Sequence, residues 1–267
     1  MPQHSALISA MQFHTQLCAL FAFAHVAMAS TLHLTLMPMA EKAPLLLDSL
    51  RYSTQAGETF SVTRCSFLLG GFALQRADGT WWEAPGHIAW IDAEKRRFDT
   101  ALENIPAGKY QALRLHLGLD AKTNAASPAQ YAPDHPLNPN LNGLHWSWQG
   151  GYIFLALEGS FRVPGQALGG YSYHLARDPN RTALTFTGDF NLTSDASAAF
   201  TFDLATLLGG PQPLSFVKDG LSTHSHEGDP VVAALKANLP AAFTLQQISS
   251  SIPEIARPSP IKPLYLP

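Results

Sequence analysis

Thr31-Leu32-His33-Leu34-Thr35-Leu36 alternates leucine with a polar residue at every step. Successive side chains of a β-strand point to opposite faces, so this period of two predicts a strand with one face in a hydrophobic core. The same alternation recurs in Gln111-Ala112-Leu113-Arg114-Leu115-His116-Leu117-Gly118, and in Phe72-Ala73-Leu74-Gln75 after a break at Gly70-Gly71. These segments are typical of a sheet with one buried face.

Turn signals separate these strands from others. Ala77-Asp78-Gly79-Thr80 and Ile105-Pro106-Ala107-Gly108-Lys109 contain residues that favour turns. Further strands are expected at residues 152–157, 171–175, 183–192 and 199–202. Short strands separated by turns predict an all-β fold, an antiparallel β-sandwich of Greek-key or immunoglobulin-like topology with long loops.

Composition excludes several classes of protein. The 267 residues are 46% hydrophobic and 14% charged, with 20 Pro and 19 Gly, which disfavours a helical bundle or coiled coil. Seventeen basic against 20 acidic residues give a net charge of -3 without long runs of either sign. Binding to nucleic acid or to a membrane through a polybasic patch therefore has no support.

The N-terminal region reads as an export signal. An apolar run over residues 14–30 ends in Ala27-Met28-Ala29, the small-x-small pattern that signal peptidase accepts. We expect a signal peptide at residues 1–29, and a soluble mature protein in the periplasm, secreted or at the cell surface. A buried N-terminal helix is the alternative. One domain is expected at residues 30–248, followed by a Pro/Ser-rich tail at residues 249–267.

Cysteine usage leaves the fold without an internal disulfide. Cys18 falls in the expected signal peptide, so Cys65 is alone in the mature chain. Its strand-like surroundings predict a buried, inert thiol rather than a ligand or nucleophile. Stability must therefore come from the hydrophobic core.

Two irregular stretches and one helix complete the expected organisation. Residues 121–144 are rich in Pro and Asn and too long for an ordinary connection, which indicates a functional loop. Residues 209–228 are also irregular. One short C-terminal helix is expected at residues 230–239, with Asp229 as its N-cap and Pro230 at its first position.

Histidine is the positive signal for chemistry, because the standard nucleophile, phosphate-loop and dinucleotide motifs are absent. Imidazole suits copper or zinc when thiolates are scarce, and an exported location favours copper. Eleven His occur in the chain; eight follow the expected signal peptide, at positions His33, His87, His116, His135, His145, His174, His224 and His226.

Spacing ranks these histidines. His224 and His226 lie two apart, so they would face the same side of an extended segment, and a flexible loop can bring both imidazoles to one ion. Both also fit as polar loop residues. His174 fits equally well as a ligand or as a packed core residue. His33 and His116 alternate with leucines and are expected to be solvated. His135 is expected in a turn, and the role of His87 stays open between metal ligand and structural residue.

Trp146-Ser147-Trp148 is expected to place two indoles on the same face of a strand. Gly150 and Gly151 follow, where a bulge or a close approach of backbone is possible. A pair of large aromatic side chains at this spacing is usually part of a core.

This segment carries a resemblance to a known family. Asp134-His135-Pro136-Leu137-Asn138 and then His145-Trp146-Ser147-Trp148-Gln149-Gly150-Gly151-Tyr152-Ile153-Phe154 resemble the P-L-N … W-S-W-Q-x-G-Y-x-F core of the MbnP-like copper-binding proteins. Tyr173-His174-Leu175 and Thr223-His224-Ser225 are similar to later motifs of that family. The resemblance extends from about residue 31 to residue 245. It departs from the four-Cys members, because only Cys65 remains here.

The resemblance implies an exported β-sandwich that binds copper for acquisition or homeostasis. In some members, His and a Trp oxidised to kynurenine by a di-haem partner enzyme of the MauG type supply the ligands. Carried over to this chain, it indicates Trp146 or Trp148 as the modified residue in a protein that we expect to be monomeric and non-catalytic. The candidate ligands are His174, His224, His145, His87 and His226.

Two other functions compete with copper binding. A carbohydrate- or ligand-binding sandwich would use exposed indoles, with Trp81, Trp82, Trp146 and Trp148 as the candidates. An exported metal-dependent enzyme would need an open metal position and an acid or base, for which Glu227, Asp229 and Asp134 lie nearest in sequence to candidate ligands. An exposed Trp platform would favour sugar, whereas indoles beside converging imidazoles would favour metal.

Overall fold

The structure, a computed structural model, describes residues 29–250. The predicted signal peptide therefore lies outside the described residues except for Ala29. The same is true of the predicted tail, of which only residues 249 and 250 are described.

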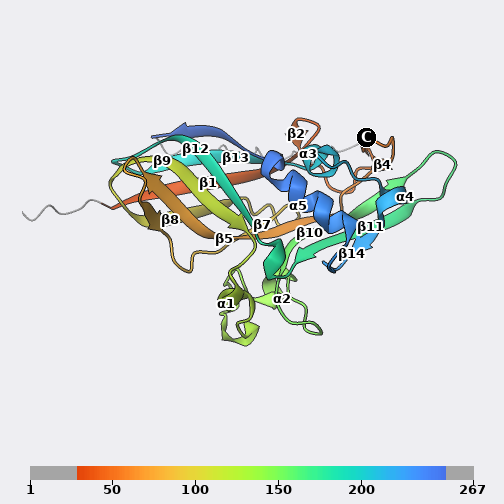
Figure 1. Cartoon of the computed structure of the whole chain (residues 1–267), viewed down its shortest axis with the longest axis horizontal. Helices are drawn as coiled ribbons and strands as arrows, with labels where there is room; N and C mark the ends of the chain where they lie inside the picture. The colour runs from red at the N-terminus through yellow and green to blue at the C-terminus, as the bar shows by residue number, and fades with distance from the viewer. Residues whose placement is uncertain (1–28, 251–267) are drawn as a thin grey trace, which may run out of the picture.

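Two β-sheets form the body of the protein (Figure 1). The smaller one has five strands in the order β15-β13-β1-β2, with β8 also paired to β1. Its strands are β1 (Ala29–Ala40), β2 (Ala43–Pro44), β8 (Asp99–Pro106), β13 (Ala196–Asp203) and β15 (Phe243–Ser249). β1 and β13 run parallel, while the other pairs in this sheet are antiparallel.

The larger sheet has ten strands, with β12-β9-β5-β10-β11-β14 as its main path. These six are β12 (Thr182–Leu192), β9 (Gly108–Leu117), β5 (Arg64–Arg76), β10 (Ile153–Arg162), β11 (Gly169–Ala176) and β14 (Ser222–Thr223). The short strands are β3 (Tyr52–Ser53), β4 (Thr59–Phe60), β6 (Trp81–Glu83) and β7 (Ala89–Asp92). The predicted all-β sandwich is thus confirmed, with the parallel pairs β1–β13 and β11–β14 added to its antiparallel pairs.

Alternating leucines build the main core between the sheets. Leu32, Leu34 and Leu36 of β1 are at most 1% exposed, as the period of two predicts. Aromatic rings then join the two sheets: Phe67 of β5 meets Phe202 of β13 at a centroid distance of 5.0 Å. Cys65 is a free, buried thiol in this core, and burial raises its pKa, so it is inert as predicted.

A second apolar cluster covers the outer face of the larger sheet. Leu68 of β5 and Phe154 of β10 point away from the main core and pack against residues of the segment between β9 and β10. That segment holds the short helices α1 (Ala121–Asn124), η1 (Pro128–Gln130) and α2 (Pro139–Asn142), which protrude below the sheets in Figure 1. The expected long loop is therefore a packed cover for one face of the sheet.

The remaining helices lie in the second half of the chain. They are η2 (Asp178–Asn180), α3 (Leu204–Gly209), α4 (Phe216–Asp219) and α5 (Pro230–Ala242). α5 begins as predicted, with the Asp229 side chain accepting from the Val231 N–H at 2.9 Å. It extends past the expected end at residue 239, even though Pro240 lies inside it.

Two local predictions were wrong. β5 continues through Gly70 and Gly71, because a bulge at this point absorbs the positive φ of Gly71. Trp146-Ser147-Trp148 is a turn rather than a strand: the Trp146 N–H donates to the Gly151 carbonyl, and Gly150 and Gly151 adopt φ of 75° and 82°.

A buried carboxylate fastens α4 to the β3–β4 hairpin. Glu58 is 3% exposed and accepts hydrogen bonds from the Ser215 hydroxyl at 2.7 Å and from the Val217 and Phe216 N–H groups at 3.0 and 3.1 Å. The Thr54 hydroxyl donates at 2.9 Å. Burial by itself raises the pKa of Glu58, but these four donors outweigh burial and hold the pKa below its ordinary value.

We predict that Glu58→Gln lowers the free energy of unfolding at pH 7 by about 2–4 kcal/mol, because donors to a charged acceptor lose their partner. Because the pKa of Glu58 is lower in the folded state, its ionised carboxylate contributes fully to stability above the pKa of the unfolded state, about 4.3. This contribution is lost as the pH falls through the pKa of the folded state. The difference between wild type and variant should therefore shrink below about pH 4. Urea unfolding across pH, with the exposed Glu94→Gln as control, measures it; an equal difference at every pH would contradict it.

Candidate metal centre

Four aromatic side chains from distant parts of the sequence converge at the edge of the second apolar cluster. The centroids of His174 and His224 lie 5.8 Å apart, and that of Trp146 lies 6.1 and 5.8 Å from them, respectively. Trp148 lies 5.6 Å from Trp146 and 6.2 Å from His224. These residues come from β11, the segment after β14, and the turn before β10. We refer to them as the His/Trp cluster.

The two indoles of the cluster are in different environments. Trp146 is only 7% exposed and belongs to the second apolar cluster, whereas Trp148 is 67% exposed. Their rings are tilted by 39°. The pair therefore does not present the flat exposed platform on which a sugar ring stacks.

His174 has one nitrogen engaged and one unpartnered. Its Nε2 lies 2.9 Å from the Glu158 carboxylate, with the Ser172 hydroxyl at 3.3 Å. Its Nδ1 is buried and has no hydrogen-bond partner. A carboxylate accepts, so it favours the tautomer in which Nε2 carries the proton and Nδ1 keeps its lone pair. A buried imidazole lone pair without a donor is the state of a histidine ready to bind a metal.

Neighbouring strands hold Glu158 in place. Arg64 of β5 is paired directly with Glu158 of β10, and His174 lies diagonally across on β11. The Arg64 guanidinium contacts the carboxylate at 3.1 Å and donates to the carbonyls of Asn142 and Gly143. The hydrogen bond from His174, together with Arg64, holds the pKa of Glu158 below its ordinary value despite burial.

Ser225 docks the segment that carries His224. The Ser225 hydroxyl donates to the His174 carbonyl at 2.8 Å and accepts from the Ala176 N–H at 2.7 Å. The segment is fixed further where Thr223 pairs with Tyr173 and donates to the helix cap Asp229. These bonds extend the sheet by one short strand and place His224 beside His174.

The other three predicted ligands lie outside the His/Trp cluster. His226 is exposed, because Ser225 adopts φ of 61° and breaks the extended geometry expected for this pair. His145 packs edge-on against Tyr152 at 4.9 Å. His87 bonds Thr100 at 2.8 Å and packs against Phe72, and burial lowers its pKa.

One further histidine has an unpartnered buried nitrogen. His116 lies on β9, and its Nδ1 has no hydrogen-bond partner. Burial and the nearby cations Arg181 and Arg114 lower its pKa. Because two guanidinium groups beside His116 would repel a metal cation, electrostatics favour metal binding at the His/Trp cluster over binding at His116.

The described residues provide two imidazoles at the cluster and no ready-made third ligand. Across residues 29–250, no group of three or more His, Cys, Asp and Glu side chains is arranged to hold a metal ion. A metal site normally has at least three ligands, so two imidazoles alone are not enough. Trp146 is the indole with ring contacts to both imidazoles. Glu158, Arg64 and Ser225 were missed by sequence reasoning, since a single polar residue within a strand or loop does not reveal its partner.

Comparisons with known proteins agree with this architecture. The family model described as MbnP matches residues 29–226. Among solved structures, MbnP from Methylosinus trichosporium is similar, with a TM-score of 0.59 and 14% sequence identity over 84% of this chain and 100% of that chain. At this identity the similarity shows a shared fold. No curated protein matches the chain. No helix in the described part of the chain is long and apolar enough to cross a membrane.

We predict that the neutral imidazole of His174 carries its proton on Nε2, and that Glu158→Ala yields a mixture of both tautomers because the acceptor is lost. Long-range 1H–15N NMR correlations of the imidazole ring distinguish the two forms. Glu83→Ala is the matched control, since it removes the other Glu–Arg pair, formed with Arg114 at 2.8 Å. An unchanged tautomer in Glu158→Ala would show that the carboxylate does not select it.

Proposed function

This chain belongs to the MbnP family, whose role is copper-related, and on that basis we propose that it binds one copper ion at the His/Trp cluster outside the cytoplasm. The observation that carries the proposal is the unpartnered, buried Nδ1 of His174 on a ring 5.8 Å from that of His224. Two imidazole nitrogens are suitable first ligands for copper. Glu158 is the outer carboxylate that orients one of them.

Trp146 is the proposed source of the third ligand. Oxidation of its indole by O2 or by two equivalents of H2O2 would cleave the C2–C3 bond to give N-formylkynurenine, and hydrolysis would release formate and free the aniline nitrogen of kynurenine beside both imidazoles. Its ring lies next to His174 and His224, whereas Trp148 has a ring contact with His224 and Trp146. Supporting this choice, Trp146 is also the more buried indole, which protects a finished site from water. We therefore assign the modification to Trp146 rather than Trp148.

The family also suggests how the site would be made and used. We propose that a di-haem enzyme of the MauG type oxidises Trp146 after export directed by residues 1–29, and that the protein serves copper acquisition or homeostasis. The exposed ring of Trp148, at 67%, lies against Trp146 and offers such an enzyme a contact surface.

We predict that the apo protein takes up close to one equivalent of copper, and that His174→Ala or His224→Ala weakens binding by at least tenfold. Each variant removes one of the few nitrogen ligands, and one lost ligand costs well over 1.4 kcal/mol, which corresponds to a factor of ten. Competition with a chromophoric copper chelator measures the affinity. His226→Ala and His33→Ala are controls, because neither residue has a ring in the cluster.

Two results would contradict this proposal. Equal copper affinity in His174→Ala, His224→Ala and His226→Ala would show that the site lies elsewhere. If the wild-type protein took up no copper, copper binding would be excluded and ligand binding through exposed indoles would be favoured.

We predict that co-expression with a di-haem enzyme of the MauG type gives the protein the mass change of one Trp-to-kynurenine conversion. Trp146→Phe should abolish that change, while Trp148→Phe should leave the modified residue at position 146 in tandem mass spectra. Modification of Trp148 in the wild-type protein would reverse the assignment. The conversion should also tighten copper binding, which is measured by the same competition assay.

A further inference from the structure

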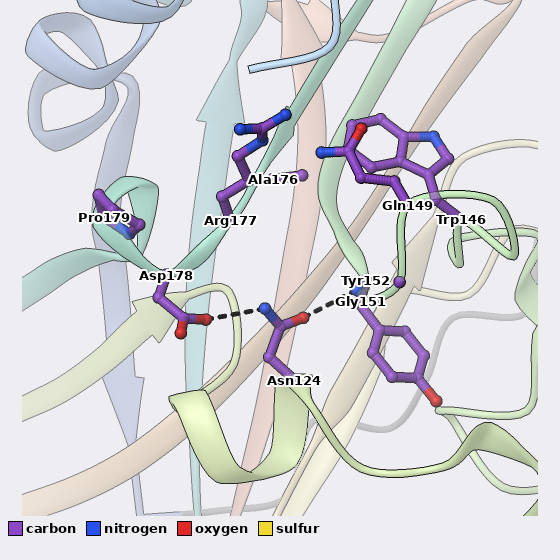
Figure 2. A pocket seen from close by; sticks show the side chains of 10 residues that line it. Asn124, Trp146, Gln149, Gly151, Tyr152, Ala176, Arg177, Asp178 and Pro179 are labelled. Carbon is purple, nitrogen blue, oxygen red and sulfur yellow. Dashed lines mark hydrogen bonds between the residues drawn. The ribbon is translucent and has the colours of Figure 1, made fainter. Parts of the chain in front are cut away.

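A pocket of about 430 Å³ lies beside Trp146, and its lining does not include His174 or His224. Besides Trp146, it is lined by Asn124, Gln149, Arg177 and Pro179 (Figure 2). This volume is in the range of small-molecule sites, which combine apolar walls with a few fixed polar groups. The pocket has an indole wall, so any occupant would lie against the ring that borders the proposed copper site.

The walls of the pocket are tied together by Asn124. Its amide nitrogen donates to the Asp178 carboxylate at 2.8 Å, and its oxygen accepts from the Tyr152 N–H at 2.8 Å. Figure 2 shows these two bonds, which link Asp178 of η2 through Asn124 to Tyr152 in the segment before β10. The pocket is therefore formed in advance, and the Asp178 carboxylate that lines it already accepts a hydrogen bond.

Arg177 is held at this pocket in an unfavourable backbone conformation. Its φ of 71° and ψ of 144° belong to a region populated almost exclusively by glycine. No ion pair forms on its guanidinium within residues 29–250. The polar partner it reaches is the Gln149 amide, whose oxygen accepts from Arg177 Nε at 2.9 Å and from Nη2 at 2.5 Å in the orientation that satisfies both groups. Arg177 keeps this strained backbone at a pocket although its guanidinium has no carboxylate partner. This combination indicates a functional role for Arg177.

We propose that this pocket binds a small planar aromatic carboxylate, with the carboxylate on Arg177 and the ring against Trp146. A guanidinium recognises a carboxylate through two parallel N–H bonds, and because Gln149 occupies Nε and Nη2 of Arg177, the Nη1–Nη2 edge would receive the ligand. Trp146 is only 7% exposed, and the part of its indole that lines the pocket offers the apolar contact for the aromatic ring. The proposal uses neither imidazole of the His/Trp cluster, but it shares Trp146 with the proposed copper site and therefore concerns the protein in which this indole is unmodified.

The test uses benzoate as the probe and benzamide as its uncharged analogue, both added at constant ionic strength to the exported protein produced without a di-haem enzyme, so that Trp146 is unmodified. Calorimetry gives the affinity, and the indole N–H resonance of Trp146, assigned with Trp146→Phe, reports the location. We expect saturable binding of one benzoate with a shift of that resonance, and at least tenfold weaker binding of benzamide. Equal binding of both compounds, or a benzoate response that does not saturate, would overturn the proposal.

Three variants separate the charge of Arg177 from its backbone strain. Arg177→Gln keeps the strain and loses the charge, so benzoate affinity should fall at least tenfold at an unchanged melting temperature. Arg177→Gly should lose binding while raising the melting temperature by roughly 2–4 °C, because glycine tolerates this φ. Arg162→Gln, which removes an exposed arginine at the end of β10, should change neither value. Full benzoate affinity in Arg177→Gln would refute the role of Arg177.

Discussion

The central strands β5 and β10 of the larger sheet are buried on both faces over much of their length, and this constraint determines where the His/Trp cluster can form. Residues of β5 and β10 alternate between the main core and the outer face, so covering only one face would leave Leu68 and Phe154 in water. Burying a side chain of this size is worth about 1.5–3 kcal/mol. The segment between β9 and β10 supplies the cover. Because Trp146 belongs to that cover, packing of the outer face also brings its indole to His174.

The same face of the sheet supplies the charges that prepare the histidine. Arg64, Glu158 and His174 occupy three neighbouring strands and form a continuous row of contacts at 3.1 and 2.9 Å. Both donors contact the same carboxylate oxygen, Oε1 of Glu158, and they favour the charged form of this half-buried acid. The consequence for His174 is one nitrogen fixed as a donor and one left with a free lone pair. The carboxylate that pairs with Arg64 is thus also the one that orients the imidazole of His174.

Local sequence patterns predicted the strands well and the turns less well. β1 and β9 followed from alternation of leucine with polar residues, and α5 from Asp229 followed by Pro230. Trp146-Ser147-Trp148 looked like a strand because its period of two is that of one, yet the backbone conformation of Gly150 and Gly151 makes it a turn. Of the predicted ligands, His174 and His224 meet at the cluster, while His87, His145 and His226 lie apart from it. Sequence spacing alone does not establish which imidazoles meet, because the distance between them depends on strand pairing.

The sequence by itself determined the β-rich sandwich, the burial of Cys65, the capped C-terminal helix and the family. Each of these depends on composition or on residues a few positions apart, where alternation and capping act. Only the tertiary structure decided that Glu158 would meet His174, that Ser225 would bring His224 beside it, and that Arg177 would enter a pocket at Trp146. The physical reason is that these contacts join residues far apart in the chain, and their geometry exists only once the strands have paired and the outer face of the sheet has been covered.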